Sequence, residues 1–416
     1  MDFSPSPRAA DLTARVREFI AREIEPVEAA YHADLAQRRA RGEDTWTPAP
    51  ILKELQAKAR AEGLWNLFLP HGHDRGYAAK YGTDGGEGLS NVDYAPIAEA
   101  TGRSGIAPYV FNCNAPDTGN AEVLLKYGTD EQCEQWLDPL LDAQIRSAFL
   151  MTEPGVASSD ATNMEATITD DGDELVINGR KWWSTGVGNP ECKFFVFMGL
   201  HRPDADRHHR HTMVLVPRDA EGVKVERMLD AFSMYDEPWG HGEVSLTNVR
   251  VPAANILVGP GKAFEIAQGR LGPGRVHHCM RTIGLAEMAL EHGIRRGLSR
   301  SAFGKPLINL GGNRERLADA RIAIDQARLL VLNAAWKLDV GGPLNAYSEV
   351  SAIKVIVPNM AQQVIDFAIQ LHGGGGVSND FPLAAAWSGV RTLRLADGPD
   401  EVHRGVVARV ELGKYR

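Results

Sequence analysis

The chain has 416 residues, of which 44% are hydrophobic and 24% charged, ordinary values for a soluble globular protein of two or three domains. Its formal net charge of -9 disfavours nucleic acid and anionic membranes as partners, because both repel an acidic protein. The four cysteines lack the spacing of a zinc or redox motif. No apolar run is long enough to span a bilayer and the first residues resemble no signal peptide, so we expect a cytoplasmic protein.

Apolar residues recur every three or four positions through much of the first part of the chain, which is typical of amphipathic helices. We expect helical segments at 10–30, 49–63, 92–102 and about 118–142. Within the last, Thr129-Asp130-Glu131-Gln132 is typical of a helix start, with Thr129 or Asp130 as the cap. The stretch 71–89 is crowded with Gly and Asp and is predicted to be a loop. These features predict an N-terminal helical domain of residues 1–146.

Short segments rich in Val, Phe and Leu follow, each with the composition of a strand. They are ELVINGRKWWST, KFFVFMGL, HTMVLVPR, VKVERML and GEVSLTNVRVP. Turns are expected at Asp171-Gly172-Asp173 and at Asn178-Gly179. Hairpin-linked strands of this kind predict an antiparallel sandwich or barrel, in a middle β domain of residues 147–258.

Long helical patterns return after about residue 260, at 275–300, 313–340, 346–371 and 399–412. The second of these contains ARIAIDQARLLVLNAAWKL, which is typical of a helix bundle. We therefore predict a C-terminal helical bundle of residues 259–416. The order helical, β, helical makes the fold class α+β.

Motifs for several other chemistries do not fit their surroundings. The run Gly373-Gly374-Gly375-Gly376 follows a helical pattern rather than a strand, which argues against a dinucleotide-binding turn. His277 and His278 are neighbours in a helical stretch, where successive side chains point about 100° apart, so they do not converge on one metal ion.

Two segments of the β region could face a ring or a phosphate. MTEPGVASS, at 151–159, is a turn with backbone N–H groups and two hydroxyls, which suits a flavin edge or a phosphate but also an ordinary loop. In KWWSTG, at 181–186, a large aromatic side chain is followed by hydroxyl residues. That order suits stacking on a ring with a hydrogen bond to it, or equally a core strand.

Taken together, in this order and spacing, the segments resemble the acyl-CoA dehydrogenase family. The carriers of the resemblance are Thr152-Glu153-Pro154-Gly155, Asn178-Gly179-x-Lys181-x-Trp183-x-Thr185, Arg300-x-x-Phe303-Gly304 and Gln370-x-x-Gly373-Gly374. The resemblance covers about residues 10 to 412. It implies an N-terminal helical domain, a middle β-barrel or sandwich domain and a C-terminal four-helix bundle.

The resemblance also implies FAD as cofactor and assigns roles by position. The implied cofactor-binding residues are Met151, Thr152, Ser158, Trp183, Ser184, Thr185, Arg300, Phe303, Gln370, Gly373 and Gly374. Thr152 would bind the pyrimidine edge of the flavin, Trp183 would pack against its ring and Thr185 would reach N5. The Arg300 and Gln370 motifs would hold the diphosphate and adenosine of FAD across a subunit interface, which implies a homodimer or homotetramer.

The implied substrate-binding residues are Ser158, near the thioester chain or CoA, together with Arg275 and Gly398. Arg275 matches a family Arg near the CoA site, although a salt bridge on a helix surface would explain it as well. Gly311 stands where many relatives have a flavin-contacting Gln.

The resemblance places the catalytic base at Asp397, in the segment Leu395-Ala396-Asp397-Gly398-Pro399, where many members have Glu. The other base position of the family is Gly274 here, which bears no carboxylate. Donors to the thioester oxygen would be a flavin ribityl hydroxyl and the backbone N–H two residues after the base. Asp397 could alternatively be only a helix cap before Pro399.

The implied reaction is α,β-dehydrogenation of an acyl-CoA thioester, with electrons passed to an electron-transfer flavoprotein. Asp at the base position also occurs in relatives that oxidise nitroalkanes, so a flavin oxidase is an alternative. A DNA-binding flavoprotein is a third possibility, which the acidic balance disfavours. The Asp-Gly-Pro-Asp and His-His-Cys-Met-Arg patterns look most like the branch that is fused in animals to a kinase-like domain, which is linked to long-chain or 4-hydroxyacyl thioesters.

Overall fold

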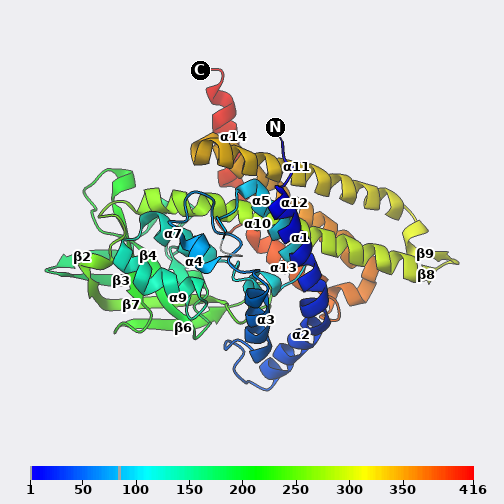
Figure 1. Cartoon of the computed structure of the whole chain (residues 1–416), viewed down its shortest axis with the longest axis horizontal. Helices are drawn as coiled ribbons and strands as arrows, with labels where there is room; N and C mark the ends of the chain where they lie inside the picture. Colours follow the sequence, from blue (N-terminus) through cyan, green and yellow to red (C-terminus); the bar gives the residue numbers. More distant parts are fainter. Residues whose placement is uncertain (1, 83–85) are drawn as a thin grey trace. The chain divides into compact units, whose positions relative to one another are not determined.

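A computed structural model describes residues 2–82 and 86–416, with the side chains of all of these except 271–273. The predicted order of helical, β and helical regions is confirmed along the chain (Figure 1). Part of the loop predicted at 71–89 lies outside the described residues, and its described part contains a short helix, α4.

The helices have the following bounds: α1 Pro7–Phe19, η1 Ile20–Ile24, α2 Glu25–Ala40, α3 Pro50–Ala61, α4 Tyr77–Tyr81, α5 Asn91–Thr101, α6 Ala107–Val110, α7 Asp117–Tyr127, α8 Asp130–Gln132, η2 Cys133–Leu137, α9 Asp138–Leu141, α10 Ala263–Ser299, α11 Asn313–Asn345, α12 Tyr347–His372, α13 Leu383–Leu393 and α14 Asp400–Gly413. The strands are β1 Arg146–Leu150, β2 Thr167–Asp171, β3 Glu174–Thr185, β4 Cys192–Leu200, β5 His211–Pro217, β6 Val223–Leu229, β7 His241–Pro252, β8 Ser301–Ala302 and β9 Lys305–Pro306. Short 3-10 turns connect several of them.

Most boundaries agree with the predictions from periodicity. Thr129 caps α8 in a reciprocal capping box with Gln132, so the predicted helix start is confirmed there. The periodicity did not reveal α13, and α11 breaks at Gly342, whose φ of 68° is not helical. Among the described helices, none has the combined length and apolar character needed to cross a bilayer.

The chain forms two compact units. One contains Met1–Pro26, Leu89–Pro108 and Arg275–Arg416, and the other contains Val27–Gly88 and Tyr109–Gly274. Each unit is described by itself below. The three sequence domains, with boundaries after residues 146 and 258, stay a prediction.

The second unit is built around a seven-stranded sheet in the order β1-β4-β2-β3-β7-β6, with β5 paired to β4. Two expectations about it were wrong. The sheet is mixed rather than antiparallel, because β1 runs parallel to β4, and β1 and β2 were not predicted as strands. Asn178-Gly179 is no turn but lies inside β3, at an irregularity in its pairing with β7.

Alternate residues of the strands point to one side and form the core of the sheet. Leu175 and Ile177 of β3 lie there with Phe195 and Phe197 of β4, all of them fully buried. All four cysteines of the chain are buried and none is in a disulfide.

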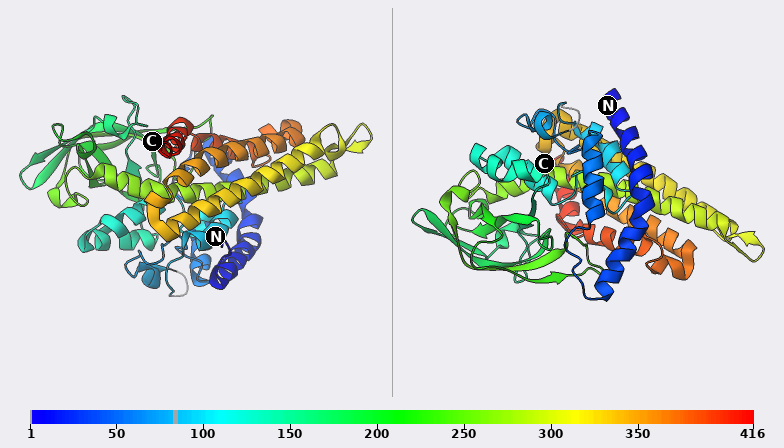
Figure 2. Two further views of the ribbon diagram at one scale, coloured as in Figure 1. Left: turned by 90° about the horizontal axis from the view of Figure 1, so that it is seen from above. Right: turned by 60° about the horizontal axis from the view of Figure 1, so that its bottom comes forward.

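The first unit is a helical bundle in which α12 packs against α11, α13 and α14 and α5 packs against α1 and α11. Figures 1 and 2 show α10 and α11 running to the β8–β9 hairpin that joins them. At the crossing of α5 and α10 the backbones nearly touch. A Cβ at Gly284 would lie 1.8 Å from the carbonyl oxygen of Glu99, and one at Gly102 would lie 1.9 Å from that of Arg281. The crossing therefore depends on two glycines.

Gly284→Ala should lower the free energy of unfolding by about 1–3 kcal/mol or more, because α5 and α10 must separate to admit the methyl group. Gly405→Ala is the matched control, since no atom lies within 4 Å of a Cβ placed at that position in α14. It should stabilise by up to about 1 kcal/mol through helix propensity. Denaturant unfolding of both variants measures the contrast, and equal stabilities would contradict the close crossing.

Candidate functional site

The turn at 151–159 follows the end of β1 and is held by a buried ion pair. The Lys181 ammonium, which is fully buried, lies 2.6 Å from Glu153 Oε1 and donates to the Met151 carbonyl at 2.9 Å. Burial lowers the pKa of Lys181 to about 8, against the raising effect of Glu153. The Glu153 carboxylate also accepts the backbone N–H groups of Glu165 and Ala166. Lys181 and Glu153 thus fix the start of the turn to β3.

Ser158 closes the same turn. Its hydroxyl accepts the Glu153 backbone N–H at 2.9 Å. The carbonyl of Thr152 accepts the backbone N–H of Trp182 at 2.9 Å, so the turn lies beside the Trp182-Trp183 segment of β3. The structure therefore brings Met151, Thr152 and Ser158 together with the second candidate segment.

Trp183 stands on a β-bulge. The pairing of β3 with β7 slips between Lys181 and Ser184, and Trp183 has a φ of 53°, in the left-handed region. A bulge of this kind turns a side chain away from the regular alternation. The Trp183 ring is 41% exposed, unusual for so large an apolar group, so the core-strand alternative does not describe it.

The two hydroxyl residues after the bulge differ. The Ser184 hydroxyl is buried and has no hydrogen-bond partner among the described residues. The Thr185 hydroxyl lies 2.8 Å from Nδ1 of His241, whose ring centroid is 5.7 Å from that of Trp183. His241 was not singled out in the sequence, because it lies at the start of a strand with no recognisable motif around it.

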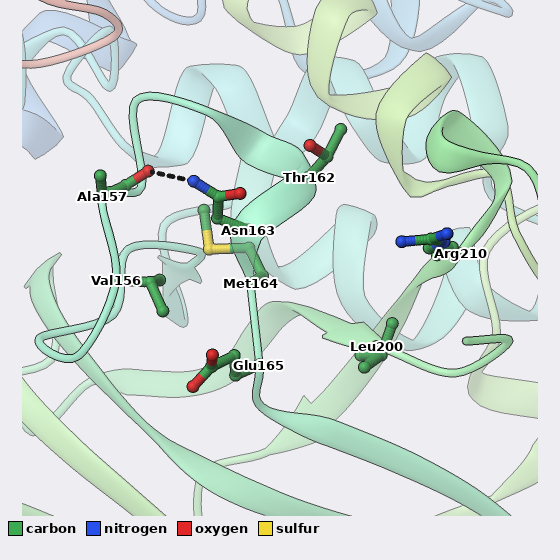
Figure 3. A pocket seen from close by; sticks show the side chains of 8 residues that line it. All are labelled: Val156, Ala157, Thr162, Asn163, Met164, Glu165, Leu200 and Arg210. Carbon is green, nitrogen blue, oxygen red and sulfur yellow. Dashed lines mark hydrogen bonds between the residues drawn. The ribbon is translucent and has the colours of Figure 1, made fainter. Parts of the chain in front are cut away.

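A hollow of about 450 Å³ adjoins the far part of the turn (Figure 3). Val156 and Ala157 of the turn line it together with Leu200 and Arg210. Thr162, Asn163, Met164 and Glu165 complete the lining. Arg210 lies across the hollow from Val156 and Ala157 in Figure 3, and its Nε donates to the Ala205 carbonyl at 3.0 Å. The hollow thus has one guanidinium and several polar groups on its walls.

Asp397 lies in the helical unit, on a tight turn between α13 and α14. Its φ is 57° and that of the following Gly398 is 105°, so both residues are in the left-handed region. The Asp397 carbonyl accepts Nε of Arg275 at 2.9 Å and Nε2 of His403 at 3.2 Å. These two side chains hold the backbone of the residue, not its carboxylate.

Lys354 of α12 also contacts the backbone around this turn. Its ammonium donates to the Leu393 carbonyl and lies 3.5 Å from that of Gly398. Burial lowers the pKa of Lys354 and of Arg275, while the negative charge of Asp397 acts in the opposite direction on both. Burial also lowers the pKa of His403 to about 4, so this imidazole is neutral at neutral pH. Sequence reasoning missed Lys354 and His403, which carry no motif.

Two expectations about Asp397 need correction. Asp397 does not cap α14, because Pro399 is the N-cap and no side chain caps that helix end. The expected N–H two residues after the base is missing, because that residue is Pro399 and proline has no backbone N–H.

Arg275 does not form the alternative surface salt bridge, since it is largely enclosed and binds a carbonyl.

The remaining candidate residues gather at the β8–β9 end of the bundle. Phe303 is 95% exposed at the tip of the hairpin, which Arg300 precedes. Gln370, Gly373 and Gly374 are exposed at the end of α12. Ile308, just after the hairpin, packs with Phe367 and Leu371 of α12, which places both groups at one end of the bundle.

The comparisons with known proteins agree with this arrangement. Residues 6–144, 148–249 and 261–412 match the N-terminal, middle and C-terminal domains of acyl-CoA dehydrogenases, in that order. The chain belongs to the acyl-CoA dehydrogenase family. The fold class that the resemblance implied is confirmed.

Individual relatives support the family. "Probable acyl-CoA dehydrogenase FadE2" of Mycobacterium tuberculosis is 48% identical over 417 residues, which cover 100% of this chain and 98% of that protein. "Acyl-CoA dehydrogenase family member 10" of Mus musculus is 51% identical over 98% of this chain, but the chain spans only 37% of that relative's length. A solved Mycobacterium abscessus structure, assigned as an acyl-CoA dehydrogenase, is 65% identical with a TM-score of 0.94, covering 99% of this chain and 100% of that one.

Lys181→Met should destabilise the β unit by about 3–5 kcal/mol, because it leaves the Glu153 carboxylate buried without its counter-charge. The double variant Lys181→Met, Glu153→Gln should recover part of this loss, since the amide oxygen can still accept N–H groups of the turn. Denaturant unfolding of the parent and the two variants measures both effects. A single variant as stable as the parent would show that the ammonium does not balance Glu153.

Proposed function

We propose that the protein catalyses the FAD-dependent α,β-dehydrogenation of an acyl-CoA thioester, with Asp397 as the base that removes the α proton. The observation that carries this proposal is the turn at Asp397. Its backbone carbonyl is held by Arg275 and His403, and Nε2 of His278 lies 3.7 Å from Oδ2 of its carboxylate. A general base must first be held in a defined position, and these contacts fix the residue that carries the carboxylate.

The surroundings of Asp397 favour its charged form. The positive charges of Arg275 and Lys354 lie close enough for Asp397 to affect the pKa of both. Opposite charges at short range stabilise a carboxylate. Since Pro399 cannot donate, we propose the N–H of Gly398 as the chain's donor to the thioester oxygen.

The residues of the β unit fit a bound flavin. Trp183 presents an exposed ring on a bulge, and the buried Ser184 hydroxyl has no partner among the described residues. An aromatic face can pack on an isoalloxazine ring, and hydroxyls and turn N–H groups can bind its polar edge. We propose that Met151, Thr152, Ser158, Trp183, Ser184 and Thr185 hold it. Bound FAD would supply the acceptor for the β hydride.

The exposed end of the bundle suits contacts with another copy of the chain. Phe303, at 95% exposure, and Gln370, Gly373 and Gly374 offer apolar and backbone surface at one end. We propose that these residues and Arg300 bind the diphosphate and adenosine of FAD across an interface in a dimer or tetramer. We further propose a cytoplasmic location and an electron-transfer flavoprotein as electron acceptor.

The hollow beside the turn suits the phosphates of CoA. Arg210 lies on its wall, and the loop that precedes Arg210 also carries Arg207, which pairs with Asp160 at 2.5 Å. Guanidinium groups bind phosphate well because their donors match its geometry. We propose that the nucleotide end of CoA lies over this hollow. Separately, we propose Arg275, together with Ser158 and Gly398, as substrate-binding residues.

Aspartate at the base position favours one alternative, oxidation of a nitroalkane or another acidic carbon acid by the same base and flavin. Both reactions need Asp397, so the substrate distinguishes them. Bleaching of the flavin by nitroalkanes but by no acyl-CoA would select the oxidase. We do not propose a DNA-binding role, because the net charge of -9 opposes it.

Asp397→Asn should abolish turnover but keep the flavin bound. Asn tolerates the left-handed backbone as Asp does, and no cap is lost because Pro399 is the N-cap. The amide cannot accept the α proton, so the rate should fall on the order of 100- to 10,000-fold. The measurement is anaerobic flavin bleaching by a panel of acyl-CoAs. Asp397→Glu should be partly active, because the added methylene misplaces the carboxylate.

Glu401→Gln is the control for this series, since Glu401 is an exposed carboxylate on the first turn of α14. It should bleach at the parent rate. An Asn variant at position 397 that bleaches as fast as the parent would remove Asp397 from the mechanism.

Arg210→Gln should raise KM for acyl-CoA by about 2- to 12-fold, which corresponds to the roughly 0.5–1.5 kcal/mol that a typical hydrogen bond contributes. The same variant should leave kcat/KM unchanged for the corresponding acyl-pantetheine, which lacks the nucleotide. Arg250→Gln is the control, because Arg250 is paired with Asp171 and Glu174 on another part of the sheet. Equal losses with both thioesters would contradict a phosphate contact.

A further inference from the structure

The face of α10 toward Asp397 carries more than Arg275. His278 lies three residues further along the helix, and its Nε2 is 3.7 Å from Oδ2 of Asp397. Positions three apart on a helix share a face, so Arg275 and His278 approach the same turn. Arg275 binds the backbone of Asp397, while His278 faces the carboxylate itself.

Arg281 determines which nitrogen of His278 carries the proton. Its Nη2 lies 3.3 Å from Nδ1 of His278. A guanidinium only donates, so Nδ1 must accept. The neutral imidazole then bears its hydrogen on Nε2, the nitrogen that faces the carboxylate. The Nε2–H of His278 then faces Oδ2 of Asp397, 3.7 Å away.

We propose that His278 is a positioning residue for the base, its Nε2–H binding Oδ2 of Asp397 so that Oδ1 is aimed at the α carbon. The inference rests on the proposed role of Asp397. The contact of 3.7 Å is slightly longer than a hydrogen bond. A small rotation of the aspartate carboxylate closes it, since that terminal torsion is broad. Catalytic hydrogen bonds commonly tighten in this way when substrate binds.

A contact that positions the carboxylate would compensate for the short side chain of Asp397. Aspartate is one methylene shorter than the glutamate found in many relatives, and a misplaced reacting group of about 1 Å can cost on the order of 100-fold in rate. The left-handed backbone of Asp397 fixes the position of its Cβ, and the contact with His278 fixes the position of its carboxylate. A donor on one oxygen also favours the charged carboxylate, as hydrogen bonds to a charged form generally do.

Several other ionisable groups lie near the pair among the described residues. On α10 these are Arg275, His277, Cys279 and Arg281; on α12, Tyr347 and Lys354; on α14, Asp400 and His403. Burial lowers the pKa of His277 to about 3 and that of His403 to about 4, so both stay neutral above pH 5. Burial raises the pKa of Cys279 to about 12, and Asp400 is already ionised because Arg394 and Asn359 offset its burial and lower its pKa. The titration of these four groups therefore does not account for an acidic limb above pH 5.

The test measures the limiting rate of anaerobic flavin bleaching by an acyl-CoA between pH 5 and 9, with the purified flavoprotein. His278→Ala should lower the limiting rate by about 10- to 100-fold. It should also move the acidic limb to higher pH by about one unit, because the carboxylate loses a donor that favours its charged form. The thioester concentration that gives half the limiting rate should change little, since His278 contacts the base.

Two further variants separate positioning from packing. His278→Gln places an amide N–H near the position of Nε2 and should restore most of the rate and the parent's acidic limb. His278→Asn carries the same group one bond shorter, near Nδ1, and should behave like His278→Ala. These polar variants decide the question even if the Ala variant does not fold. His292→Gln, on the same helix, should match the parent.

Some outcomes overturn the inference. A His278→Ala or His278→Asn variant with the parent's rate and acidic limb, beside an inactive Asp397→Asn, would remove His278 from the mechanism and leave the proposed function intact. An active Asp397→Asn would overturn the proposed base and this inference with it. Equal losses in the Gln and Asn variants, with an unmoved acidic limb, would make His278 a packing residue only.

Discussion

The Asp397-Gly398 turn is the constraint on which the proposed chemistry depends. Asp397 and Gly398 both have positive φ, which glycine adopts readily and aspartate tolerates at some cost. The structure stabilises the turn through its carbonyl oxygens, which accept from Arg275, His403 and Lys354. These three side chains bind the backbone of the turn and not the side chain at 397.

The β unit also places a candidate site residue on backbone with positive φ. Trp183 also has a positive φ, and the bulge around it lifts a large ring out of the sheet. Strained backbone of this kind persists only where the surroundings hold it in place. Lys181, directly before the bulge, is tied to Glu153 and Met151, and the buried pair provides that hold. In each unit, a residue with positive φ orients the side chain that we propose for the reaction. Nearby cations stabilise the backbone around that residue.

Hydrophobic periodicity and capping motifs predicted the helices and strands whose ends depend on residues close together in the sequence. The capping box at Thr129 and most helix and strand boundaries follow from spacing along the chain. The strand β1 was missed because its partner β4 lies more than 40 residues away, and a five-residue segment carries too little alternation. The bulge at Trp183 was missed because one inserted residue does not change a hydrophobic pattern. Motif resemblance could locate Asp397, but Lys354 and His403 reach its turn from distant helices that carry no motif. His278 could have been found, since it shares the face of a predicted helix with Arg275.

The contacts around Asp397 are compatible with the base that we propose, although positive charges lie nearby. Had Arg275 and Lys354 bound the carboxylate directly, they would have occupied its oxygens and weakened its affinity for a proton. They bind carbonyl oxygens instead, which satisfies two buried cations that would otherwise be costly. The neutral His403 adds a further hydrogen bond without a third charge. Nε2 of His278 faces the carboxylate, and we propose that this neutral donor orients it.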